Sequence, residues 1–208
     1  MLLLLAAMCS CTQLYYKAQE KIGNEKRDIL VDRIKKGREN QEKAKEQYKT
    51  TLEAFQAATG FKGGKTEDVY KKLKGEFDEA ADRTRKVSEQ IKSIEQVSGD
   101  MFDEWEKELS GMRNASLRKQ SNILLRDTRR RYADLIRKMK VVEAKAKPVL
   151  KAFEDQVLFI KHNLNAKAIS SLKNNVVKLD ADVQTLIRDI EISTREADEF
   201  IASLPKDS

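Results

Sequence analysis

The spacing of the apolar residues constrains the fold of this chain more than any other feature of its sequence. From residue 73 onward, apolar residues recur at alternating steps of four and three. Sustained over many turns, this spacing places them along one side of a long helix, where they pack against a partner helix. We call each such series an apolar seam. The three seams are Leu73, Phe77, Ala80, Thr84, Val87, Ile91, Ile94, Ser98, Met101, Trp105, Leu109 and Met112; Leu117, Ser121, Leu124, Thr128, Tyr132, Leu135, Met139, Val142, Ala146, Val149, Phe153, Val157, Ile160 and Leu164; and Ile169, Leu172, Val176, Leu179, Val183, Leu186, Ile190, Thr194, Ala197, Ile201 and Leu204.

The N-terminal segment carries a weaker version of the same pattern. Its apolar positions are interrupted by small or polar residues at Gly37, Gln41 and Ala44. Polar residues inside a seam weaken helix packing locally and fix its register. The apolar positions of this segment are Ile22, Ile29, Leu30, Ile34, Tyr48, Leu52 and Phe55.

Two breaks in the pattern coincide with turn-forming residues. The stretch "GFKGGKT" (60–66) separates the first two segments, and we expect Thr66 to cap the following helix. The stretch "SGMRNAS" (110–116) separates the next two, with Asn114 or Ser116 as the capping residue.

A third break, "HNLNAK" (162–167), contains neither glycine nor proline. Either Asn165 caps a separate last helix, or two helices run on as one. Within the preceding helix, Pro148 predicts a kink, because proline removes one backbone donor and crowds the preceding turn.

Together these features predict an all-α fold. Charged residues make up 36% of the 208 residues, with only 8 Gly and 2 Pro, so long helices are favoured over a sheet with many turns. We expect an elongated antiparallel helical bundle or coiled coil of three to four long helices within residues 11–208. The expected helices cover about 13–58, 66–110, 115–163 and 166–204.

The first residues, "MLLLLAAMCSC", resemble the apolar core of a secretory signal peptide and are too short to span a bilayer, which takes about 20 residues. The ending looks like a bacterial lipobox. Residues 1–10 would then be a lipoprotein signal peptide and Cys11 the lipidated first residue, with Cys9 as the runner-up. Position 12 is Thr and not Asp, and in this the sequence resembles lipoproteins that are sorted to the outer membrane. The inner membrane is the second choice for the location of the anchor.

Four stretches carry a resemblance to a known family: "KRDILVDRI" (26–34), "FDEWEKEL" (102–109), "RDTRRRYADLI" (126–136) and "DQVLFIKHNLNAKAISSL" (155–172). By these the chain resembles a gammaproteobacterial domain-of-unknown-function family of predicted helical lipoproteins. Some of its members carry the label "DNA repair ATPase". The resemblance implies a helical lipoprotein and supplies no catalytic residues.

The ATPase label can be tested on "GFKGGKT". A P-loop needs a glycine followed by four residues and then Gly-Lys-Ser/Thr, and here the position of the first glycine is Thr59. Gly60 leaves only three residues between, one too few. A P-loop also follows a buried strand, but residues 40–58 are charged and have a helical period. We therefore interpret the stretch as a turn between two antiparallel helices.

The densest basic cluster is "RDTRRRY", with Arg126, Arg129, Arg130 and Arg131. These side chains could contact anionic lipid headgroups or a phosphate backbone. The competing interpretation is a solvated face paired with acids, because the chain carries 34 acidic residues and the net charge of +7 is interleaved along the chain. Nucleic-acid binders more often segregate their basic face, which disfavours that partner.

The sequence predicts no catalytic residue, no cofactor site and no metal site. His162 is the only histidine, and no second histidine stands at ligand spacing.

We therefore expect a non-enzymatic, lipid-anchored periplasmic bundle that serves as a scaffold or interaction module in the cell envelope. Its partners would be the membrane, through the lipid, and either an envelope protein or a second copy of the chain. The alternative is a cytosolic coiled-coil protein that binds nucleic acid or a nucleotide.

Overall fold

The computed structural model of the chain describes residues 26–204, which are helical almost throughout and contain no strand. The helices are α2 (Lys26–Thr59), α3 (Thr66–Gly111), α4 (Ala115–His162), α5 (Ala166–Ser171) and α6 (Lys173–Ser203). The predicted all-α class is confirmed.

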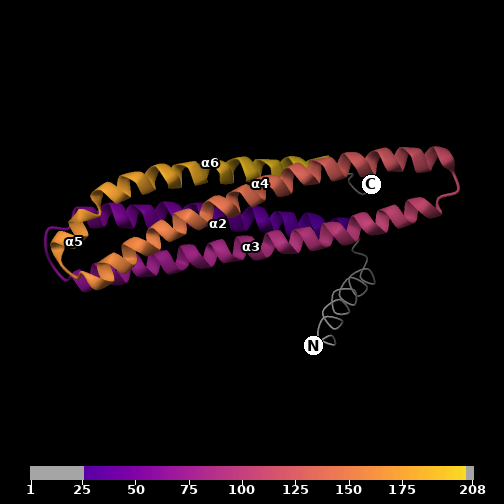
Figure 1. Cartoon of the computed structure of the whole chain (residues 1–208). Coiled ribbons are helices and arrows are strands. Elements are labelled where there is room, and N and C mark those ends of the chain that lie inside the picture. Colours follow the sequence, from indigo (N-terminus) through magenta and orange to yellow (C-terminus); the bar gives the residue numbers. More distant parts are fainter. Residues whose placement is uncertain (1–25, 205–208) are drawn as a thin grey trace, which may run out of the picture.

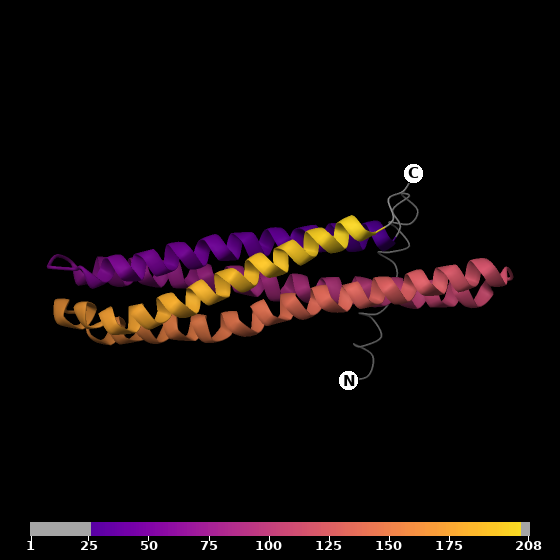
Figure 2. The same cartoon turned by 90° about the horizontal axis from the view of Figure 1, so that it is seen from above.

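The four long helices form one elongated bundle (Figure 1). α2 packs on α3 and α6, and α4 packs on the same two helices from the opposite corner. Each helix runs antiparallel to the two neighbours that it contacts (Figures 1 and 2). The short α5 closes one end against α2 and α4.

The apolar seams form the core along most of the bundle. Leu73, Ile94, Leu135, Phe153 and Ile190 are at most 1% exposed, as their seam positions predict. Gly37, in the more weakly patterned N-terminal segment, has a packing role. A Cβ at this position would lie 2.9 Å from Ile94 Cδ1 and 3.0 Å from Met139 Cε. Glycine at this position therefore lets α2 approach α3 and α4 closely.

Aromatic rings fill the wider parts of the core. The Phe55 and Phe153 rings lie 5.0 Å apart between α2 and α4. Tyr132 of α4 packs between Phe102 and Phe200, with ring centroids 5.5 and 6.3 Å away. The first contact joins α2 to α4, and the second group of rings joins α3, α4 and α6.

Several predicted seam positions are exposed, which corrects the sequence-based core. Met112, Leu117 and Leu124 lie at the far end of the α3–α4 hairpin, and Leu125 is buried there instead of Leu124. The reason is that α3 and α4 extend beyond the first residue of α2 and the last residues of α6 (Figure 2), so no other helix of residues 26–204 covers this end. Leu164 is also exposed, because it lies in the connection between α4 and α5.

The helix caps agree with the sequence in two places of three. Asn114 Oδ1 accepts hydrogen bonds from the backbone N–H groups of Ser116 and Leu117, and Asn165 Oδ1 accepts one from Ala168. The prediction for Thr66 is wrong: Lys65 holds the N-cap position, with no side-chain cap.

Two further observations concern the helix boundaries in the C-terminal half. The expected last helix is two helices, interrupted at Leu172. α4 continues through Pro148 without a break.

Candidate surface site at the end of the α3–α4 hairpin

The projecting end of the α3–α4 hairpin is the most distinctive surface of the described chain. Its two helices are tied together by the Trp105 Nε1–H group, which donates a hydrogen bond to Ser121 Oγ at 2.9 Å. The turn at 112–114 is closed by the Asn114 cap, which satisfies two of the free N–H groups at the start of α4. Contacts of its own therefore hold the hairpin together where α3 and α4 are the only described helices.

The predicted arginine cluster lies just behind this end, on α4. Arg129 forms an ion pair with Glu106 of α3, and its guanidinium lies 5.1 Å from the centroid of the Phe102 ring. Arg130 and Arg131 both pair with Asp127, Arg131 Nε to Asp127 Oδ2 at 2.9 Å.

Arg126 differs from the other three arginines. It is exposed and has no acidic partner among the described residues. The four residues thus do not form one uniform patch: three are held in ion pairs on the bundle, and the fourth belongs to the projecting end.

We define the hairpin tip as residues 109–126. The apolar spacing does not identify this segment as a site, although the sequence holds one signal: the segment contains four basic residues and no Asp or Glu. Four of the six large apolar side chains in this segment are also solvent-exposed. They are Met112 (37%), Leu117 (55%), Ile123 (51%) and Leu124 (54%).

The glycine-rich turn at the other end of the bundle connects α2 to α3. Gly63 and Gly64 have φ of 150° and 125°, a region that only glycine occupies without strain. Thr66 Oγ1 donates a hydrogen bond to the Leu164 carbonyl at 3.2 Å, so the turn is tied to the α4–α5 connection. The turn follows a helix, whereas a phosphate-binding loop follows a strand.

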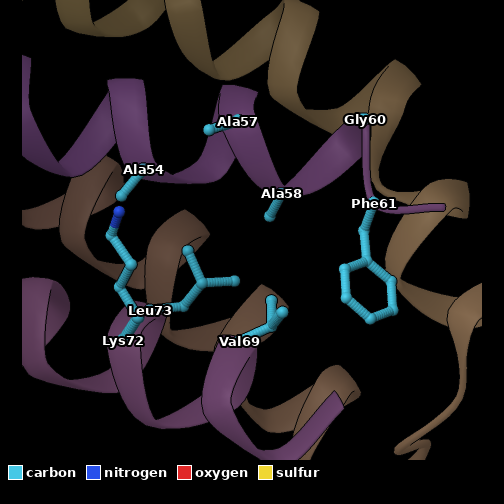
Figure 3. Close-up of a pocket in the computed structure, with 8 residues that line it drawn as sticks. All are labelled: Ala54, Ala57, Ala58, Gly60, Phe61, Val69, Lys72 and Leu73. Atoms are coloured by element: carbon cyan, nitrogen blue, oxygen red, sulfur yellow. The ribbon is translucent and has the colours of Figure 1, made fainter. Parts of the chain in front are cut away.

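A shallow apolar pocket of about 210 Å³ lies beside this turn, between the end of α2 and the start of α3 (Figure 3). Small side chains of α2, including Ala54 and Ala58, face Leu73 and Val69 across the gap, and Lys72 is the one charged lining residue. Ligand sites typically enclose about 300–1,000 Å³ and offer several converging polar groups. We interpret the pocket as a gap left by alanine packing.

The remaining sequence candidates do not assemble into a reactive centre within residues 26–204. His162 is exposed at the last residue of α4. No three His, Cys, Asp or Glu side chains of the described chain are grouped to hold a metal ion. Cys9 and Cys11 lie outside the described residues.

The buried phenol of Tyr48 contacts groups of the helix core. The Tyr48 hydroxyl donates to Thr84 Oγ1 at 2.7 Å, and Thr84 in turn donates to the Ala80 carbonyl. Burial raises the pKa of Tyr48 to about 12, against the opposing effect of its hydrogen bond to Thr84. The phenol therefore stays neutral at physiological pH.

The length and apolarity of the described helices test whether any of them could span a membrane. None of them, over residues 26–204, combines the length and the apolarity that a membrane crossing requires.

The fold and the tip define the class of the molecule: an elongated antiparallel four-helix bundle with one projecting basic and apolar hairpin. The model of the family described as "Protein of unknown function (DUF2959)" matches residues 15–204, and the chain belongs to this family. No curated protein matches the chain. No solved structure matches it either.

Proposed function

We propose that this protein is a non-enzymatic, lipid-anchored helical bundle that serves as a scaffold or interaction module on the periplasmic face of the cell envelope, attached to the outer membrane through Cys11. The observation that carries the proposal is the sequence "LLLLAAMCSC", in which a short apolar run leads into small residues and a cysteine. The family match begins at residue 15, so the matched region starts just after the proposed modification site.

The bundle supports a binding role over catalysis. Its long helices present extended surfaces, and its core is closed by large apolar side chains such as Tyr48, Phe55 and Phe153. The ion pairs between helices stabilise the bundle along its sides, for example Arg38 with Asp198 at 3.0 Å between Nε and Oδ1. A rigid rod of this kind suits a module that holds a partner at a fixed distance from its anchor.

The proposal is tested by following lipid attachment in the native host. Cells expressing the chain are labelled with radioactive palmitate, with and without globomycin, which blocks lipoprotein signal cleavage. We expect labelled protein in the membrane fraction and an unprocessed precursor under globomycin. Cys11→Ser should abolish both the label and the processing.

Cys9→Ser is the matched control, because it removes the neighbouring cysteine and leaves Cys11. It should retain the label; loss of label with Cys9→Ser alone would move the modification to Cys9. A soluble, unlabelled, full-length product that binds DNA at physiological salt would instead support the cytosolic nucleic-acid-binding alternative.

A further inference from the structure

The hairpin tip is left uncovered by the architecture of the bundle. Lys26, the first residue of α2, pairs with Glu104 of α3 at 2.9 Å between Nζ and Oε2. α3 runs on from there to Gly111, and α4 returns from Ala115 (Figure 2). The apolar residues that would have faced α2 and α6 therefore face solvent, which is costly for a cluster of side chains unless a partner covers them.

The tip also carries charge that the bundle does not neutralise. No ion pair joins any of its four cations to an acid within residues 26–204, whereas the arginines directly behind the tip are paired. One of these cations has a hydrogen bond within the turn: Arg118 Nη1 donates to the Met112 carbonyl oxygen at 3.4 Å. The four cations are Arg113, Arg118, Lys119 and Arg126.

The two kinds of residue are arranged amphipathically at the start of α4. Leu117 and Leu124 are seven residues apart and share one side of the helix. Lys119 and Arg126 are also seven residues apart and lie on the opposite side. An apolar side combined with a basic side is typical of helices that lie at the interface of an anionic bilayer.

Charge argues against a second copy of the chain as the partner. Two tips brought together would place four cations against four, with no acid in either tip, and like charges in contact are destabilising. A negatively charged surface has no such cost, and each Lys or Arg near an anionic membrane contributes about a fivefold gain in binding.

The position of Lys26, the first described residue, agrees with a membrane at this end of the bundle, and this step rests on the proposed lipid anchor. Residues 12–25 join Cys11 to Lys26 and span at most about 50 Å. Met112 lies eight residues beyond Glu104 in α3, or about 12 Å along the axis at the helical rise. The opposite end lies a full α2 away, about 50 Å, so an anchored chain brings the tip to the bilayer far more readily.

We propose that the hairpin tip binds the surface of an anionic bilayer, with Leu117 and Leu124 at the acyl-chain boundary and the four tip cations on lipid phosphates. The lipid anchor and the tip would then give the bundle two contacts with one membrane. Two contacts fix the orientation of a rod, whereas one contact at its end leaves the rod free to tilt.

The test uses the full chain with Cys9→Ser and Cys11→Ser, so that no lipid can be attached. Cosedimentation is measured with vesicles of phosphatidylcholine alone and with vesicles that also contain phosphatidylglycerol. We expect binding to the mixed vesicles that weakens as salt rises from about 0.1 M to about 1 M, where the Debye length falls from about 10 Å to about 3 Å. The residues preceding α2 are common to all variants and set a common baseline.

Two tip variants then separate the charged and apolar contributions. Arg118→Ser with Lys119→Ser should weaken binding about 25-fold, at about fivefold per cation. Leu117→Ser with Leu124→Ser should also weaken it by tenfold or more, because two half-exposed leucines no longer bury their surface. Both pairs are on the surface, so the melting temperature by circular dichroism should stay unchanged.

The opposite end of the bundle supplies matched controls, because it too carries exposed basic and apolar residues. Lys161→Ser with Lys167→Ser, and Leu158→Ser with Leu164→Ser, repeat the same chemical changes at exposed positions far from the tip. These pairs should leave vesicle binding unchanged. Equal losses from both ends, or loss only from the control pairs, would overturn the proposal.

Other outcomes also decide it. Absence of binding to phosphatidylglycerol vesicles would overturn the proposal, and dimerisation abolished by the tip variants would assign the tip to a second copy. If palmitate labelling fails and vesicle binding is intact, the proposed anchor is wrong and the proposal for the tip is unaffected. Labelling without tip-dependent binding would do the reverse.

Discussion

A fully buried amide in the core of α2 gives the sharpest test of the packing. Gln41 is 0% exposed, and neither its Nε2 nor its Oε1 has a hydrogen-bond partner among the described residues. In the unfolded chain both atoms are hydrated, so folding leaves a polar group unsatisfied at a cost of about 1–3 kcal/mol. Methionine has a similar unbranched shape and no such requirement.

We therefore expect Gln41→Met to raise the free energy of unfolding by about 1–3 kcal/mol. For a domain of this size the melting temperature should rise by about 2–4 °C for each kcal/mol. Urea titration followed by circular dichroism measures the first quantity and a thermal scan the second. Light scattering is needed beside them, because a buried polar residue also fixes register and oligomeric state.

Two other glutamines serve as comparisons, because the same substitution should stabilise the protein less at each of them. Gln156 is buried with only Oε1 unsatisfied, since its Nε2 donates to the Ala152 carbonyl at 3.2 Å, so Gln156→Met should gain less than Gln41→Met. Gln184 is exposed on α6, and Gln184→Met should change stability by less than about 0.5 kcal/mol. A loss of stability in Gln41→Met, with the other two variants behaving as expected, would refute the reasoning.

Four further substitutions test the helices and one buried phenol. Pro148→Ala, at an exposed site inside α4, should raise the free energy of unfolding by up to about 3 kcal/mol in the same urea titration; a decrease would show that α4 needs the proline to pack. Gly99→Ala has open space and should gain about 0.5–1 kcal/mol, whereas Gly37→Ala should gain nothing because its Cβ would lie 2.9 Å from Ile94 Cδ1; equal gains would contradict the close approach. The pKa of Tyr48 is raised to about 12 in the folded state, so the free energy of unfolding should hold below pH 10 and fall by about 2 kcal/mol as pH rises from 10 to 12. Tyr48→Phe should remove that part of the fall, and an unchanged pH profile in this variant would refute the reasoning.

The periodic part of the fold was predictable because it depends on local sequence. Steps of three and four fix which side of a helix is apolar, and short connections make consecutive helices antiparallel. Residues such as Ile94, Leu135 and Phe153 were therefore identifiable as core. The caps by Asn114 and Asn165 were equally local, since each accepts from a backbone group two or three residues ahead.

Other details depended on contacts between distant segments. Thr66 has the residue type of an N-cap, but its hydroxyl is used 98 positions away in sequence, on the Leu164 carbonyl. The interruption at Leu172 likewise follows no breaker residue. It falls where the short α5 packs on α2 and α4 before the chain turns into α6.

The hairpin tip shows why periodicity alone could not separate a core from a surface. Met112, Leu117 and Leu124 continue the seam in the same rhythm as the buried residues behind them. Whether they are covered depends on where α2 begins and α6 ends, which the seam does not encode. The charge pattern does change at this point, because acids are interleaved with bases along the bundle and absent from residues 109–126. A seam that continues after the acids stop is therefore better interpreted as a surface prepared for a negatively charged partner than as an unfinished core.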